Sequence, residues 1–134
     1  MEQTNIKYPK KEKLKSKIVI SELFTSGKTV SKYPLRMVYV PITNTDDVPL
    51  KTGVSVSKRY FKKAVDRNYF KRLLREAYRL NKQLLLDHTD EQYAIMLFYQ
   101  SKDRLSFQEV NEKMIKLFEK FITATQPKST VTEE

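Results

Sequence analysis

The spacing of apolar residues changes along the chain, and each spacing predicts one kind of element. Residues 14–26 repeat apolar positions at helical intervals, and Gly27 follows as a typical C-cap residue. Residues 35–40 are rich in apolar residues and precede Pro41, which predicts a strand that ends at the proline. Residues 43–49 are rich in turn-forming residues and predict a loop after this strand.

A second strand is predicted over residues 51–57, where apolar residues alternate with small ones. Val54 and Val56 would face a core, whereas the alternate positions, including Gly53 and Ser55, would line the opposite face. A strand with one apolar face and one face of small, polar residues often presents a surface against which a partner lies.

The longest predicted helix carries the strongest charge pattern of the chain. In a helical projection at 100° per residue, apolar side chains gather on one face and polar ones on the other. The apolar face consists of Tyr69, Phe70, Leu73, Leu74, Ala77, Leu80 and Leu84. The polar face consists of Arg67, Asn68, Lys71, Arg72, Arg75, Arg79 and Lys82. We therefore expect the first face to pack on the sheet and the second to remain exposed.

Two further elements follow. Residues 93–99 form a near-continuous apolar run, which is typical of a strand buried on both faces. Ser106 and Glu109 have the spacing of a capping box and predict a last helix that runs through about Thr123. The predicted order is α-β-β-(β)-α-β-α, with the strand in parentheses optional, and it defines an α+β domain.

The length of 134 residues suits one domain with a hydrophobic core. We expect this domain to span residues 13–124. Residues 1–12 predict a flexible basic arm, and residues 125–134 predict a disordered tail.

Charge narrows the class of partner. The 26 Lys and Arg residues outnumber the 16 Asp and Glu residues, which gives a net charge of +10 and a pI near 9.7. Between Lys58 and Lys82 the chain has ten basic residues and two acids, Asp66 and Glu76. Like charges at this density repel one another. The imbalance therefore indicates a polyanionic partner, either nucleic acid or acidic lipid.

Two simpler interpretations of the basic helix compete with nucleic-acid binding. A basic face can merely be solvated, although here the imbalance is confined to one segment. A helix that lies on a membrane needs its apolar face free, whereas this apolar face is the natural cover of the sheet. Nucleic acid fits better, because Arg67, Arg72 and Arg75 can each hold two phosphate oxygens. Lys71 adds a point charge, and Asn68 can donate to phosphate or 2′-hydroxyl oxygens.

No catalytic constellation is visible in the sequence. His88 is the single histidine, and its position beside Asp87 and Asp90 fits an exposed turn better than a metal or general-base site. Asp46 and Asp47 likewise indicate a turn. Two glycines cannot build a P-loop or a dinucleotide-binding fingerprint. We expect neither a catalytic residue nor a metal ligand in this chain.

The absence of cysteine excludes disulfides and thiolate metal sites, and it fits a reducing cytoplasm. The N-terminus lacks the apolar segment of a signal peptide, and no apolar run approaches the length of a transmembrane helix. We therefore expect a cytoplasmic protein without a membrane partner.

Three segments in this order carry a family resemblance: GVSVSK at 53–58, AVDRN at 64–68 and KRLLRE at 71–76. Together they resemble the bacterial ribonuclease P protein component, and the resemblance extends over residues 14–122. Tyr69 stands where the family has an arginine. The segment before the helix lacks the family's glycine and has one additional residue.

The resemblance implies a single-domain sandwich of helices on a central mixed sheet, similar to the second domain of ribosomal protein S5. It also implies a left-handed βαβ crossover through the basic helix. The implied function is that of a monomeric protein subunit in a ribonucleoprotein, which binds the catalytic ribonuclease P RNA and the 5′ leader of precursor tRNA. The RNA would remove the leader by Mg²⁺-dependent hydrolysis, with the Mg²⁺ held in the RNA active site.

The resemblance also implies two groups of site residues. RNA contacts would come from Lys58, Arg59, Lys62, Lys63, Arg67, Asn68, Lys71, Arg72, Arg75 and Arg79. A leader-binding cleft between the first helix and the sheet would include Lys17, Phe24, Tyr39 and Ser55. The alternative is a general RNA-binding protein of ribosomal type without a role in cleavage. An autonomous nuclease is disfavoured, because the sequence offers no histidine or carboxylate site.

Overall fold

The computed structural model describes residues 13–14, 16–42, 48–89 and 91–125. Its elements are α1 (Lys17–Ser26), β1 (Lys28–Lys32), β2 (Leu35–Pro41), β3 (Leu50–Val56), α2 (Ala64–Asp87), β4 (Tyr93–Tyr99) and α3 (Phe107–Thr125). The order α-β-β-β-α-β-α confirms the predicted α+β class. The additional strand is β1, which precedes the strands predicted at 35–40 and 51–57, whereas the optional strand was placed after them. The predicted arm at 1–12 and most of the predicted tail lie outside the described residues.

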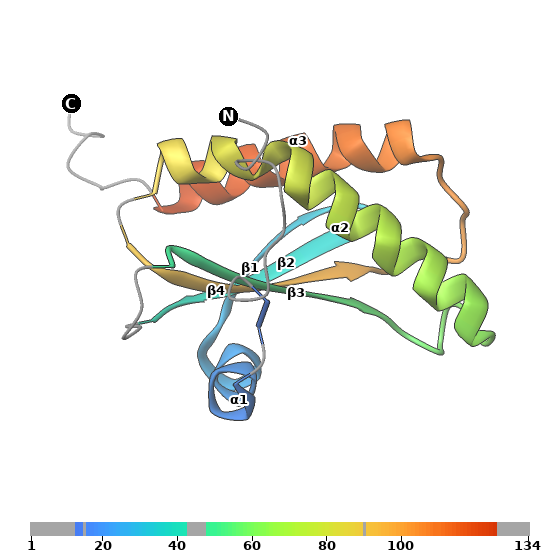
Figure 1. Cartoon of the computed structure of the whole chain (residues 1–134), viewed down its shortest axis with the longest axis horizontal. Helices are drawn as coiled ribbons and strands as arrows, with labels where there is room; N and C mark the ends of the chain where they lie inside the picture. Colours follow the sequence, from blue (N-terminus) through green and yellow to red (C-terminus); the bar gives the residue numbers. More distant parts are fainter. Residues whose placement is uncertain (1–12, 15, 43–47, 90, 126–134) are drawn as a thin grey trace.

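The four strands form one mixed sheet in the order β1-β2-β4-β3. Strand β2 is antiparallel to β1 and β4, whereas β3 is parallel to β4. Helix α2 connects these two parallel neighbours and thereby forms a βαβ crossover. Figure 1 shows α2 and α3 on one face of the sheet and α1 on the opposite face.

Two cores follow from this arrangement. The larger core lies between the sheet, α2 and α3, where Ile95 and Leu97 of β4 are fully buried. The smaller core lies under α1, where Leu23 packs with Val38, Val40 and Ala94. Strand β4 contributes to both cores, which confirms the prediction of a strand buried on both faces.

Strand β1 is the element that the hydrophobic pattern did not place. Its sequence KTVSK has a single apolar residue, Val30, because an edge strand needs only part of one face covered. The Lys120 Nζ of α3 donates a hydrogen bond to the Ser31 carbonyl, with 2.7 Å between the two atoms.

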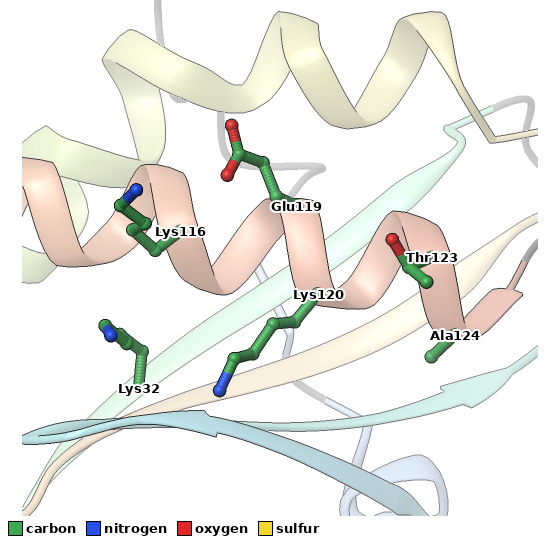
Figure 2. A pocket seen from close by; sticks show the side chains of 6 residues that line it. All are labelled: Lys32, Lys116, Glu119, Lys120, Thr123 and Ala124. Atoms are coloured by element: carbon green, nitrogen blue, oxygen red, sulfur yellow. The ribbon is translucent and has the colours of Figure 1, made fainter.

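Beside this contact, β1 and α3 enclose a pocket of about 380 Å³. Figure 2 shows its lining side chains, with Lys32 from β1 and Lys116, Glu119, Lys120, Thr123 and Ala124 from α3. Lys32 lies on the edge strand, where a lysine discourages pairing with another chain.

Helix α1 begins three residues later than predicted, and Ser16 is its N-cap. The predicted role of Gly27 after the helix is correct, but a left-handed backbone is not the reason for the glycine, since its φ is −69°. A Cβ atom at this position would overlap the Leu23 carbonyl oxygen and would lie 2.7 Å from Val38 Cγ1. Gly27 therefore lets the end of α1 approach the sheet closely.

The predicted capping box is present at the start of α3. The Ser106 backbone N–H donates to Glu109 Oε1 at 2.9 Å, and the Glu109 N–H donates to Ser106 Oγ at 3.2 Å. These bonds satisfy two backbone donors that the helix itself leaves without partners. The helix extends to Thr125, two residues beyond the predicted end.

Candidate nucleic-acid interface

The exposed face of α2 carries part of the polar set that the sequence predicted there. Asn68, Arg72 and Arg75 occupy one side of the helix and are exposed to solvent. None of these three makes a hydrogen bond or ion pair with the part of the chain that the structure describes. Lys71 lies beside them and is half-buried. The helix therefore offers unpaired polar groups to a partner.

Arg67 has a different environment from Arg72 and Arg75. Its Nη1 donates to the Phe61 carbonyl at 2.9 Å and to the Lys62 carbonyl at 2.8 Å. These bonds hold the preceding loop against the first turn of α2. The two carbonyl oxygens fix the position of the guanidinium against the loop.

Arg79 is paired within the helix. It forms an ion pair with Glu76, and its Nε donates to Glu76 Oε1 at 3.2 Å. The hydrogen bond from Arg79 lowers the pKa of Glu76 and raises that of Arg79, so both groups are charged at neutral pH. The positive charge on α2 is therefore least compensated near Arg72 and Arg75.

The buried face of α2 is rotated relative to the predicted face. Lys82 is only 5% exposed, so its predicted place on the solvent face is wrong. Tyr69 and Leu80 are 44% and 43% exposed, so their predicted places on the buried face are wrong too. The cause is contact with α3: Tyr78 is buried with its ring 6.3 Å from Phe118, which turns the helix toward the Lys82 side.

The loop between β3 and α2 carries the remaining predicted RNA contacts. Its exposed cations are Lys58, Arg59, Lys62 and Lys63. The loop turns on Ser57, whose carbonyl accepts hydrogen bonds from the backbone N–H groups of the third and fourth residues after it. Phe61 then inserts into the core and stacks on Phe70 with 4.6 Å between ring centroids. The loop needs no glycine, because no described residue has a positive φ.

A second polar surface lies on the α1 side of the sheet. Strand pairing places Arg36, Phe98 and Ser55 in one row across β2, β4 and β3. The Arg36 guanidinium lies 5.4 Å from the centroid of the Phe98 ring. Phe24 of α1 reaches this row, with its ring 6.3 Å from Phe98, and is itself 62% exposed. We call Phe24, Arg36, Ser55 and Phe98 the α1-side surface.

The structure brings two of the four predicted leader-binding residues together on this surface, Phe24 and Ser55. Lys17 is exposed at the first turn of the same helix. Tyr39 was placed on the wrong face: it is 4% exposed, and its ring packs 4.8 Å from Phe121 in the larger core. Alternation along β2 puts Tyr39 on that side, and burial raises the pKa of its hydroxyl.

Sequence reasoning missed Arg36 and Phe98. Side chains alternate between the two faces of a strand, and this alternation could have placed Arg36 on the α1 side, because Val38, two residues later, packs under α1. Phe98 likewise follows Ala94 and Met96 on the α1 side of β4. The pairing between strands, which the sequence did not give, is needed to place these two residues beside Ser55.

His88 ends α2 as an exposed C-cap residue, and its Nδ1 lies 3.0 Å from the Leu84 carbonyl oxygen. This local contact fits the predicted turn. Within the described residues, no group of three or more His, Cys, Asp or Glu side chains is placed to hold a metal ion. Asp46, Asp47 and Asp90 lie outside those residues. None of the described helices has both the length and the apolar character needed to cross a membrane.

The fold and these surfaces define a small, basic α+β protein with an arginine-bearing helix and a separate aromatic and cationic surface on its sheet. The sequence matches the family model Ribonuclease P over residues 8–122. The chain belongs to the ribonuclease P protein family. The ribonuclease P protein component of Porphyromonas gingivalis is 42% identical over 110 residues, which cover 80% of each chain. That of Dictyoglomus turgidum is 34% identical over 84% of this chain and 91% of its own.

Solved structures agree with this assignment at the level of the fold. The ribonuclease P protein of Staphylococcus aureus has a TM-score of 0.66 at 18% identity, covering 82% of this chain and 94% of its own. The protein from Thermotoga maritima has a TM-score of 0.64 at 24% identity, covering 81% of this chain and 96% of its own. The resemblance that the sequence motifs indicated is confirmed.

Proposed function

We propose that this chain is the protein subunit of ribonuclease P and acts as a monomer within the cytoplasmic ribonucleoprotein. In this proposal α2 and the loop before it bind the catalytic RNA subunit, and the α1-side surface holds the 5′ leader of precursor tRNA. Family membership supports the role in ribonuclease P. The observation that carries the two-surface assignment is the separation of Arg72 and Arg75 from Phe24 and Ser55 by the sheet.

The reaction is hydrolysis of one phosphodiester bond, which releases the leader and leaves the mature 5′ end of the tRNA. Mg²⁺ held by the RNA subunit would activate water and stabilise charge on the phosphate. The location of the metal in the RNA stays a prediction. The residues of this chain bind and orient the two RNA molecules.

The exposed face of α2 suits contact with folded RNA. A guanidinium binds two phosphate oxygens at once, and unpaired arginines lose no internal ion pair when they do so. Arg72 and Arg75 fulfil this condition. Their charge also lowers the repulsion between the RNA subunit and its precursor substrate, since both are polyanions.

The α1-side surface suits a single strand. Exposed aromatic rings stack on unpaired bases, and nearby cations hold the phosphates between those bases. Phe24 supplies an exposed ring, the half-buried Phe98 supplies a second ring beside it, and Arg36 supplies the nearby cation. Ser55 occupies the end of the row on β3, where its small side chain leaves space for the strand.

Reconstitution with a bacterial ribonuclease P RNA tests the proposal. We expect the protein to stimulate 5′ maturation of precursor tRNA at low Mg²⁺, where the RNA alone is slow. RNA binding without stimulation would instead favour the alternative, a general RNA-binding protein of ribosomal type. Cleavage by the protein alone would favour an autonomous nuclease.

A bulky residue in place of Ser55 tests the leader-binding surface. We expect Ser55→Trp to weaken binding of precursor tRNA by about tenfold and to leave binding of mature tRNA unchanged, because only the precursor has a leader. Thr123→Trp, on the opposite side of the sheet, is the matched control. Equal weakening for both tRNAs would remove Ser55 from the leader-binding surface.

A further inference from the structure

A pocket of about 520 Å³ lies at the end of the sheet where β2 begins and β3 and β4 end. Its lining residues come from the β1–β2 turn, the loop after β3 and the loop after β4. They are Tyr33, Arg59, Tyr60, Gln100, Ser101, Lys102 and Asp103. Its volume lies in the range of small-molecule binding pockets, so a nucleotide fits by size.

Tyr33 is the most exposed aromatic residue of this pocket, with 67% of its surface open. Its hydroxyl nevertheless donates to Ser101 Oγ at 2.9 Å, and Ser101 is only 3% exposed. The same Oγ accepts a hydrogen bond from the Asp103 N–H at 2.9 Å, which fixes the position of the Ser101 side chain. The ring thus gains little from burial and yet has a fixed orientation. A ring held in this way loses little side-chain entropy when a partner stacks on it.

Positive charge accompanies this ring. The Arg59 guanidinium lies 5.6 Å from the centroid of the Tyr60 ring, and Lys102 is exposed. Asp103 is the single acid among the residues that line the pocket. Stacking rings beside cations are the combination that binds single-stranded nucleic acid.

The pocket adjoins the α1-side surface. The Gln100 N–H donates to the Pro34 carbonyl at 2.8 Å, which continues the β2–β4 pairing one step beyond Leu35 and Tyr99. Gln100 lies two residues after Phe98, a distance of about 7 Å along an extended strand. A single RNA strand that lies on the α1-side surface therefore reaches the pocket with its next nucleotides.

We propose that this pocket binds an unpaired nucleotide of the precursor tRNA leader, with the base stacked on Tyr33 and a phosphate beside Arg59 and Lys102. The Gln100 amide has both donors and an acceptor, and it contacts the edge of the base. The inference rests on the proposed binding of the leader to the α1-side surface. It reassigns Arg59 from the RNA subunit to the substrate.

The test uses the reconstituted holoenzyme and precursor tRNAs whose leaders are lengthened one nucleotide at a time. With the unmodified protein, affinity should rise with leader length and then level off. Tyr33→Ala should remove only the last increment, a loss of about tenfold for long leaders and no change for short ones. Tyr33→Phe keeps the ring without its hydrogen bond to Ser101, and it should retain part of that increment.

The controls separate this inference from the proposed function. Ser55→Trp should weaken binding at every leader length, and Lys116→Ala, on α3, should change nothing. If Ser55→Trp acts and Tyr33→Ala does not, the pocket does not bind the leader. If neither acts, the proposed leader surface is wrong as well. Weaker binding of the RNA subunit by Tyr33→Ala, with leader increments unchanged, would overturn the assignment to the leader.

Discussion

Arg67 and Arg72 lie on the same helix, and a helical projection puts both on the cationic face. Their surroundings differ. Arg67 bridges two carbonyl oxygens of the preceding loop, whereas Arg72 has no partner among the described residues. A charged donor that satisfies two carbonyls stabilises the folded chain, and an unpaired surface arginine leaves that stability almost unchanged. The two residues therefore allow structural and RNA-binding roles to be measured separately.

We expect Arg67→Ala to lower the free energy of unfolding by about 1–2 kcal/mol, because it leaves two carbonyls without their donor. Arg72→Ala should change it by less than about 0.5 kcal/mol. Arg72→Ala should instead weaken binding to ribonuclease P RNA and reduce the salt dependence of that binding by roughly one unit of slope. Urea denaturation and RNA titrations at several salt concentrations measure both effects. Equal stability losses in the two variants would contradict the assignment.

Buried tyrosines of the larger core make the free energy of unfolding depend on pH at alkaline pH. Burial raises the pKa of Tyr93 above its ordinary value of 10.0, since the folded chain disfavours the tyrosinate. Below about pH 10 the Tyr93 hydroxyl is protonated in both the folded and the unfolded state, so it adds no pH dependence to the free energy of unfolding. Above that pH the unfolded state loses its proton first, so stability falls as pH rises.

Tyr93→Phe removes this ionisation without removing any hydrogen bond that the described residues make to the hydroxyl. We expect the variant to lose less stability than the unmodified protein between about pH 10 and pH 12. Urea denaturation across that range measures the difference. Parallel curves for the two proteins would show that Tyr93 does not contribute to alkaline unfolding.

At the scale of elements, the position of α1 depends on how closely its end approaches the sheet. The contact is made at Gly27, where a Cβ atom would overlap backbone and the Val38 side chain. At Gly53 on β3, an added Cβ would lie 3.2 Å from Met96 Sδ, which belongs to a flexible side chain. Backbone cannot move aside as a methionine can, so the two glycines tolerate a methyl group differently.

We expect Gly27→Ala to destabilise the protein by about 1–3 kcal/mol and to displace α1 from the sheet. Gly53→Ala should cost less, because Met96 can adopt another rotamer. Displacement of α1 moves Phe24 away from Phe98, so Gly27→Ala should also weaken binding of precursor tRNA. Urea denaturation and precursor titrations test both statements. A larger stability loss for Gly53→Ala would reverse the expected order.

The sequence predicted elements that have a strong local signal. The apolar run at 93–99 and the capping box before α3 are such cases, since each signal comes from neighbouring residues. Features that depend on tertiary contacts were not predicted. The polar edge strand β1 has too few apolar residues to stand out, and the rotation of α2 depends on contact with α3.

The candidate site shows the same contrast between features set by local sequence and features set by tertiary contacts. Ser55 was placed correctly from alternation along β3 alone, whereas Tyr39 was placed on the wrong face, where no parity argument along β2 supported it. Arg36 and Phe98 lie beside Ser55 only because β4 pairs with both β2 and β3, and β4 is far from both of these strands in the sequence. Local periodicity gives the face of a residue, but the sheet register decides its neighbours.

At the scale of the whole molecule, the sheet separates two surfaces of different character. Helices α2 and α3 cover one face, and α1 covers only part of the other (Figure 1). The exposed arginines of α2 are suited to phosphates of a folded RNA, and the α1-side surface is suited to bases of a single strand. A small protein can in this way contact an RNA subunit and its substrate at the same time.

This separation predicts independent effects. Combined Arg72→Ala and Arg75→Ala should weaken binding of the RNA subunit, whereas Phe24→Ala should weaken binding of the leader within the assembled enzyme. Because the two surfaces share no side chain, the variant with all three changes should bind the RNA subunit as the double arginine variant does, and once the RNA subunit is saturated it should bind precursor tRNA as Phe24→Ala does, within about 0.5 kcal/mol. The measurement is precursor affinity for each variant at a protein concentration that saturates the RNA subunit. A deviation well beyond that margin would mean that one RNA segment spans both surfaces, which is incompatible with separate sites for the RNA subunit and the leader.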